Sequence, residues 1–332
     1  MRLGTVRIRG TAARPVGLVG ERVIDIAEAA FDLGLIEGPY SAPHPRTLVE
    51  LFDLGRYGDA LLADLEKAVQ DHGDVANAPW AFGLDEVTFL APVPRPGKVV
   101  CVGGNKENPG DPLDASMQDE WPRPIYFEKA PSAVTGHGAT VEAWGVMRPV
   151  QVEGEICLII GKRGRHLKAE DAMSVVAGCA LLNDMSAGRF GLQDGMAIYI
   201  SKGVGNPKEE MITRSMTRAK IPDGMCPIGP WLVPIADLGV PFEDLVVTTQ
   251  VGPNIVQEGS VGSYGFSAGR CLEEISKWIT LEPGDVVSLG AFAQKPDHPL
   301  RFTDAASEGN QKVVVSCPQL GELVTHVTLV DA

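Results

Sequence analysis

The sequence contains no apolar run long enough to cross a membrane. Its longest run, Val175 to Leu182, includes a glycine and falls far short of the roughly 20 residues that a membrane-spanning helix requires. Arg2 and Gly4 lie at the very start of the chain, which is unlike the start of a signal peptide. We therefore expect a cytoplasmic protein that has no membrane partner.

Basic residues are scarce. The chain has 29 Lys and Arg against 43 Asp and Glu, a formal net charge of −14, and no run of Lys or Arg interrupts the acidic balance. Such a charge repels nucleic-acid phosphates and anionic lipid heads. The hydrophobic fraction of 44% is that of an ordinary soluble globular protein. The expected partners are therefore small molecules, metal ions or proteins, and not nucleic acid.

Cysteine pairs at metal-binding or redox spacing are absent. The six cysteines include no C-x-x-C pair, and no His stands at zinc-finger spacing from them. Most lie in apolar strings, which favours buried free thiols in a reducing compartment. They are Cys101, Cys157, Cys179, Cys226, Cys271 and Cys317.

Glycine and proline are abundant instead, and one proline-rich segment divides the chain. With 38 Gly and 25 Pro, the sequence predicts many turns and much β-structure. Segment Ala91–Lys98 has three prolines in five positions, which neither a helix nor a sheet interior accommodates. We therefore predict a small N-terminal α/β domain over residues 1–93 and a larger second domain over residues 98–332.

Hydrophobic periodicity predicts the main elements of both domains. In the first, alternation predicts strands that lead into a helix, and Arg56–Gln70 has leucines at helical spacing. In the second, Lys106–Pro124 is a polar loop that could act as a lid, and the other segments are mainly strands, giving a β-dominated α+β fold. Those segments are a strand in 98–105, a strand in 149–162, a helix then a strand over Glu170–Leu182, a helix over Phe266–Ile279 opened by Ser267, and three strands in 281–330.

The clearest candidate site is Glu153-Gly154-Glu155 at the start of an alternating strand. Side chains two apart in a strand share a face, and the intervening glycine permits close approach. Adjacent carboxylates repel unless a cation lies between them. A third acid, Asp184, follows an apolar string and should be partly buried. Three such carboxylates suit Mg²⁺ or Mn²⁺. The alternative is a solvated strand face.

Six segments along the second domain resemble, in order, the signatures of the fumarylacetoacetate hydrolase family. They are PVPRPGKVVCVGGN, PIYFEKAPSAVTG, VEGEICLIIGK, AGCALLNDMSA, KIPDGMCPIGPWLVP, and IVQEG with ITLEPGDVVSLG. The likeness covers about residues 91–332, and the N-terminal part is similar to the family's smaller leading domain. It implies a mixed β-sandwich or β-roll catalytic domain, a homodimer, and one Mg²⁺ or Mn²⁺ held by Glu153, Glu155 and Asp184.

The resemblance also implies a substrate class. Family members act on 2-oxo or 1,3-dioxo acids, with the metal stabilising the substrate's enolate. Lys220, with Asp223 and Pro227 in register, matches a family lysine that contacts substrate, and Lys129 matches another site lysine. For each lysine the alternative is a solvated surface ammonium.

The sequence departs from the family pattern near the expected site. Hydrolytic members carry G-x-N-Y-x-x-H, whose His activates water, whereas this chain reads GGNKENPGDP and has Pro109 at the His position. Because proline cannot exchange a proton, that base is absent. In addition, Gly290-Ala291 replaces a Gly-Thr pair that binds a substrate carboxylate, and Val261 replaces a threonine.

Together these features predict a divalent-metal enzyme that acts on a small 2-oxo or 1,3-dicarbonyl compound. C–C bond hydrolysis is the leading expectation. Dehydration, decarboxylation and isomerisation carry nearly equal weight, because they need no activated water. A non-catalytic metal and ligand binder that has lost its base is the remaining alternative.

Overall fold

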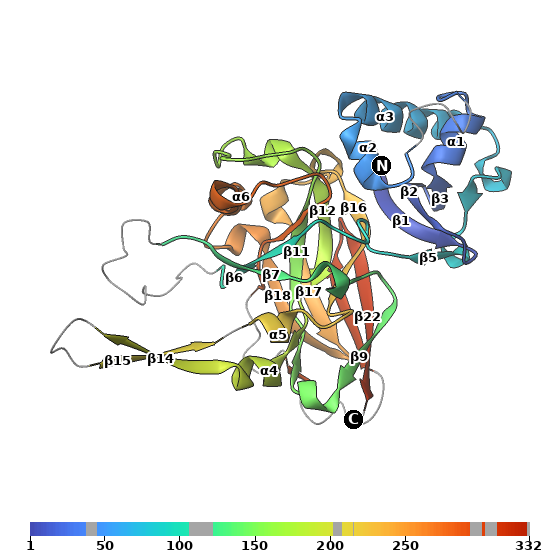
Figure 1. The fold of residues 1–332 in the computed structure, drawn as a ribbon. Helices are drawn as coiled ribbons and strands as arrows, with labels where there is room; N and C mark the ends of the chain where they lie inside the picture. The colour runs from blue at the N-terminus through green and yellow to red at the C-terminus, as the bar shows by residue number, and fades with distance from the viewer. Residues whose placement is uncertain are drawn as a thin grey trace.

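Two β-sheets lie face to face at the centre of the structure (Figure 1). The computed structural model describes residues 1–37, 45–105, 122–201, 208–214, 216–292, 301–302 and 311–330. Within them the larger sheet has twelve strands. Its main path runs β4 (Ala81–Phe82), β3 (Arg22–Asp25), β2 (Ala13–Val19), β1 (Arg2–Ile8), β16 (Cys226–Val233), β12 (Val176–Asn183), β11 (Gly154–Ile160), β19 (Val286–Ser288), β6 (Val99–Gly103) and β7 (Ile125–Lys129), while β5 (Val87–Phe89) pairs with β1 and β8 (Val134–Thr135) with β16.

The second sheet covers one face of the first. Its order is β18 (Asn254–Ser260), β17 (Val246–Val251), β21 (Gln311–Cys317), β22 (Gly321–Val330) and β9 (Ala139–Trp144). Smaller sheets are β13 (Ser186–Ala187) with β10 (Val150–Gln151) and β20 (Arg301–Phe302), and the hairpin of β14 (Gly195–Ser201) and β15 (Lys208–Arg214), which projects away from the body (Figure 1).

Helices lie at the periphery of the sheets. Ser267 caps the N-terminus of α6 through a side-chain hydrogen bond from Arg270 N, as the sequence predicts. The helix expected over Arg56–Gln70 is also confirmed, as α3. The α-helices are α1 (Ile26–Asp32), α2 (Leu48–Asp53), α3 (Arg56–Asp71), α4 (Gly188–Gln193), α5 (Thr217–Lys220) and α6 (Ala268–Trp278).

Strand β11 is buried on both faces, which explains its unbroken apolar sequence. Ile156, Leu158 and Ile160 belong to the core that it shares with the second sheet. Cys157 and Ile159 point the other way, into a core that includes the helices of the N-terminal part. Burying each large apolar side chain contributes roughly 1.5–3 kcal/mol, so this strand is a rigid base for the residues that precede it.

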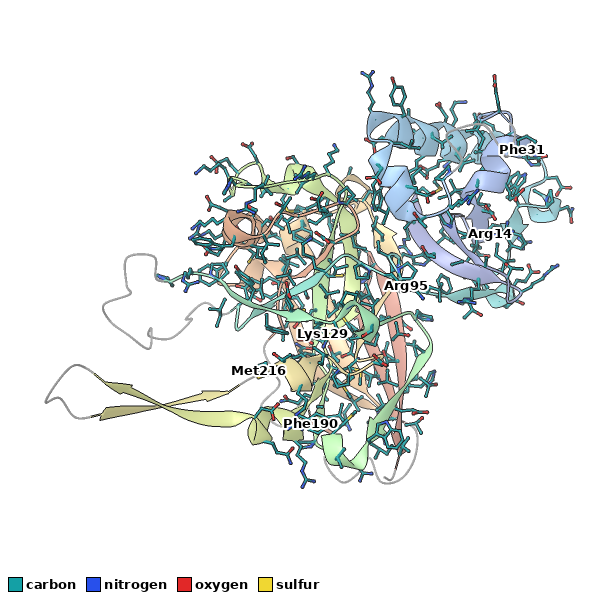
Figure 2. All side chains as sticks on the ribbon, in the orientation of Figure 1. Arg14, Phe31, Arg95, Lys129, Phe190 and Met216 are labelled. Carbon is teal, nitrogen blue, oxygen red and sulfur yellow. The ribbon has the colours of Figure 1, made fainter. Side chains whose placement is uncertain are left out.

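The N-terminal part joins the larger sheet directly. Strand β1 pairs antiparallel with β16, with Leu3 opposite Leu232. The segment 91–98 contains neither helix nor strand, as its prolines predict, and Arg95 lies at the junction of the two parts in Figure 2. The division of the chain into domains at this segment stays a prediction.

The helix expected to begin at Glu170 is wrong. The segment from Glu170 forms only a 3-10 turn over Ala172–Val175 before β12 begins at Val176. The chain enters β12 at once, because that strand pairs with β11 along its length, and too few residues remain for an α-helix. The expected strands in 98–105 and in the tail are confirmed. The single strand expected over 149–162 is instead divided into β10 and β11, which belong to different sheets. The proposed lid, Lys106–Pro124, lies outside the described residues except at its end.

All six cysteines are buried and free, which confirms the expectation of buried free thiols. Among the described helices, none has both the length and the apolar character that crossing a bilayer requires.

Candidate metal centre

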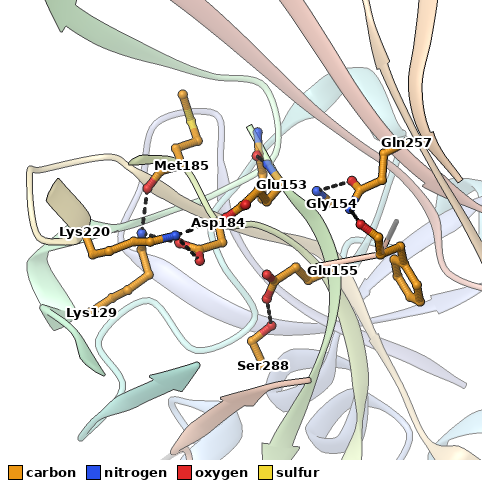
Figure 3. Close-up of polar contacts among 11 residues, drawn as sticks. Lys129, Glu153, Gly154, Glu155, Asp184, Met185, Lys220, Gln257 and Ser288 are labelled. Carbon is orange, nitrogen blue, oxygen red and sulfur yellow. Dashed lines mark hydrogen bonds and ion pairs between the residues drawn. The ribbon is translucent and has the colours of Figure 1, made fainter. Parts of the chain in front are cut away.

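The pairing of β11 with β12 brings the three predicted acids together. Gly154 lies opposite Asn183, and Asp184 N donates to Glu153 O at 2.7 Å. Glu153 and Glu155 flank Gly154, so both side chains point away from the second sheet and toward Asp184 (Figure 3). One carboxylate oxygen from each acid lies within 4.8 Å of the others. The strand register therefore builds a cluster of three carboxylates.

Burial distinguishes the three acids. Glu155 and Asp184 are 2% and 1% exposed, and the Glu153 side chain is 22% exposed. A solvated strand face, which the sequence left open, does not describe this arrangement. Because Glu153 alone reaches solvent, the cluster opens on its side.

Both predicted lysines are buried beside these acids. Lys129, the last residue of β7, donates from Nζ to Asp184 Oδ1 at 2.7 Å and to Met185 O at 2.9 Å. Lys220, the last residue of α5, donates to Asp184 Oδ2 at 2.5 Å and to Glu153 Oε2 at 3.1 Å. Neither lysine is a solvated ammonium, since they are 2% and 4% exposed.

The pKa directions follow from burial and charge. Burial raises the pKa of Glu155 well above its usual value, and the charges of Asp184 and Glu153 raise it further. For Asp184 burial acts in the same sense, but Lys129 and Lys220 outweigh it and lower the pKa. For Lys220 burial lowers the pKa, and the charges of Asp184 and Glu153 more than compensate, so the net shift is upward. Lys220 therefore keeps its proton.

The residues present fit a divalent cation. Carboxylate oxygens are the ligands that Mg²⁺ and Mn²⁺ prefer. The Lys220 ammonium already bridges Glu153 and Asp184, which indicates that this position favours positive charge. Glu155 has no cation at ion-pair distance among the described residues, and its partner there is the hydroxyl of Ser288. A divalent ion would relieve the repulsion that raises the Glu155 pKa.

Two hydroxyl groups near the acids were not singled out from the sequence. Ser288, at the end of β19, donates to Glu155 Oε2. Tyr264 donates to Gly290 O at 2.6 Å, and burial and the charge of Glu155 raise the pKa of its phenol. A polar residue ending an otherwise apolar strand is a weak signal for Ser288. No sequence pattern pointed to Tyr264, which supplies a hydroxyl close to Gly290-Ala291, where the family's threonine hydroxyl is missing.

His137 packs in another part of the fold. Its ring stacks edge-on with that of Phe89, at a centroid distance of 5.6 Å, and lines a cleft of about 470 Å³ with Trp231. Its Nδ1 accepts from Val324 N at 3.2 Å. The acids of the segment that follows Asn105 lie outside the described residues. They are Glu107, Asp111, Asp114 and Glu120.

Comparison with known proteins gives a family match over most of the chain. Residues 98–328 match the family model described as fumarylacetoacetate (FAA) hydrolase C-terminal. The chain is 30% identical over 279 residues to the oxaloacetate tautomerase YisK of Bacillus subtilis (strain 168), covering 83% of this chain and 84% of that one. It is 30% identical over 246 residues to the human mitochondrial oxaloacetate tautomerase FAHD2A, covering 74% and 69%.

A solved structure shares the fold over the whole chain. Maleylpyruvate hydrolase from Sphingobium sp. SYK-6, in complex with manganese(II) ion and pyruvate, superposes with a TM-score of 0.67 at 21% identity and covers 99% of both chains. The β-dominated architecture expected from the sequence is therefore confirmed.

Proposed function

Because the chain belongs to the fumarylacetoacetate hydrolase family, whose members are metal-dependent enzymes, we propose that it is a tautomerase of a 2-oxo acid such as oxaloacetate. Two curated relatives at 30% identity carry that activity in their names. The observation that carries the proposal is the cluster of Glu153, Glu155 and Asp184 beside two buried lysines.

Tautomerisation moves a proton between a carbon and an oxygen of the substrate and needs no attack by water. When bound by the three carboxylates, Mg²⁺ or Mn²⁺ would supply positive charge that favours the enolate form of the substrate. The chain's own residues hold the carboxylates in place. Lys129 fixes Asp184 through one carboxylate oxygen, and its second hydrogen bond to Met185 O fixes the ammonium itself.

Lys220 is the proposed contact for the substrate. It keeps its proton, and it lies next to Glu153, where the cluster reaches solvent. A protonated ammonium there can donate to an oxygen of an anionic substrate and stabilise the charge that develops on it. The proposed partner is thus a small carbonyl acid, and the proposed assembly is a homodimer, as expected for the family.

Hydrolysis of a C–C bond is the second candidate. The shared fold with a maleylpyruvate hydrolase favours it, whereas the proline at position 109, where hydrolytic members have a histidine, argues against it. Tautomerisation is preferred because it requires no activated water.

An ultraviolet assay of the enol form of oxaloacetate tests this proposal. Fresh enol is mixed with the protein and Mg²⁺ or Mn²⁺, and its decay is compared with that in metal alone, in protein after chelation, and in the Glu155→Gln variant. We expect acceleration with metal and wild-type protein only. Decay equal to that in metal alone would reject the tautomerase, and cleavage of a 2,4-dioxo acid without tautomerase activity would favour the hydrolase.

A further inference from the structure

Gln257 on β18 binds the backbone between the two glutamates. Its Oε1 accepts from Gly154 N at 2.8 Å, and its Nε2 donates to Phe292 O at 3.0 Å (Figure 3). The Thr249 hydroxyl donates to the same Oε1 at 2.7 Å. Gln257 and Thr249 are both 0% exposed. With both ends bonded, the amide has one orientation, and its oxygen must face Gly154.

The register of the second sheet explains this contact. Thr249 and Gln257 are direct partners across β17 and β18, and Gly154 is the residue of β11 that faces them. A Cβ at position 154 would collide with Thr249 Oγ1 and lie 3.2 Å from Gln257 Oε1. The glycine therefore lets two polar side chains of the second sheet reach the backbone of the first.

Each residue of the Glu153-Gly154-Glu155 segment is held by a different strand. Asn183 Oδ1 accepts from Glu153 N at 3.2 Å, Gln257 holds Gly154, and Ser288 donates to the Glu155 carboxylate. These partners come from β12, β18 and β19. Gln257 differs from the other two because it joins the segment to the second sheet.

We propose that Gln257 is a positioning residue for the metal centre, which fixes the backbone at Gly154 and so sets the separation of the Glu153 and Glu155 carboxylates. The inference rests on the proposed metal site. Partners that orient metal ligands without touching the metal typically change metal affinity by 10–100-fold when removed. Gln257 acts through the backbone at Gly154, so its loss should leave the positions of both glutamates less well defined.

Direct Mn²⁺ binding to the full chain, measured by calorimetry well below the unfolding temperature, tests this role. Gln257→Met preserves side-chain length and removes both polar ends. Its matched control is Gln250→Met on the adjacent strand β17, where the side chain donates to Gly252 O. We expect the Mn²⁺ dissociation constant to rise at least tenfold in Gln257→Met and to stay within twofold of wild type in Gln250→Met.

The outcomes separate the two proposals. A Gln257→Met protein that binds Mn²⁺ within twofold of wild type would overturn the positioning role and leave the metal site intact. If this variant fails to fold, Thr249→Val decides, because it removes the hydroxyl that orients Gln257: a threefold or larger rise in dissociation constant supports the role, and an unchanged constant overturns it. No Mn²⁺ binding by wild-type protein would overturn the metal site and this inference together.

Discussion

At the scale of single residues, the two buried lysines explain how Asp184 can stay ionised inside the protein. Each of its oxygens accepts from one ammonium, Lys129 at Oδ1 and Lys220 at Oδ2. A carboxylate buried without such partners would take up a proton instead. Glu155 shows the contrast, because it has a hydroxyl partner and a raised pKa.

Replacing Lys129 by Met should destabilise the metal-free protein. The substitution keeps most of the side-chain volume but leaves Asp184 Oδ1 and Met185 O without their donor. Removing one partner of a buried ion pair costs about 3–5 kcal/mol, and since Lys220 still pairs with Asp184 we expect a loss of about 3 kcal/mol in the free energy of unfolding. Urea titration with chelator present measures it.

The control for this variant is Lys67→Met, because Lys67 forms an exposed pair with Asp71 on α3. Exposed pairs contribute little to stability, so the control should unfold like the wild type. If both variants unfold at the same urea concentration, the buried pair of Lys129 and Asp184 stabilises the protein no more than the exposed pair does.

The sequence predicts the charged residues of the site better than their neutral supports. Spacing and the family resemblance both indicate Glu153, Glu155 and Asp184, since a polar residue in an apolar string needs a partner. Ser288 and Gln257 carry no charge, and each lies more than 100 residues along the chain from the residue that it binds, Glu155 or Gly154. Their contacts depend on strand pairing across two sheets, which local patterns do not specify.

At the scale of elements, the start of β11 is constrained from both sides. Glu153, directly before the strand, accepts a hydrogen bond from Lys220, and Gly154 faces Thr249 on the second sheet. The glycine is therefore required for packing, in addition to any role in admitting a ligand. Close approach at this glycine is expected from the sequence, and the structure identifies the Thr249 hydroxyl as the group that approaches.

Gly154→Ala should be destabilising by steric overlap. The added methyl group would meet Thr249 Oγ1 and lie 3.0 Å from Val315 Cγ1, and overpacking of this kind costs roughly 1–3 kcal/mol. Urea unfolding measures the loss. Gly73→Ala is the control, since nothing lies within 4 Å of a Cβ at that exposed position.

A double variant identifies the cause. If the overlap with Thr249 is responsible, Thr249→Ala combined with Gly154→Ala should be less destabilised than the sum of the two single variants. Strict additivity would contradict the proposed contact.

The two helices with clear hydrophobic periodicity were predicted correctly. The short helix expected from Glu170 was not. α3 and α6 show helical spacing, and Ser267 marks the start of α6. The segment beginning at Glu170 has helix-compatible residues, but β12 pairs with both β11 and β16 and begins at Val176. Sheet pairing outweighed local preference there.

At the scale of the whole molecule, the site is assembled from distant parts of one chain. Lys129 comes from β7, Lys220 from α5 and Ser288 from β19. Glu155 lies in β11, Glu153 directly precedes that strand, and Asp184 directly follows β12. The larger sheet also extends into the N-terminal part through the β1–β16 pair. Because so many elements meet at the acids, the geometry of the metal centre depends on the entire sandwich.

The most direct test of the account is Mn²⁺ binding by wild-type protein and by Glu155→Gln, which removes one charge without a cavity. Glu142→Gln, on the exposed side of β9, serves as the control. We predict one tightly bound ion per chain in the wild type and the control, and a dissociation constant at least 100-fold higher in Glu155→Gln. Equal affinity in all three proteins would contradict the assignment of the three carboxylates as the metal centre.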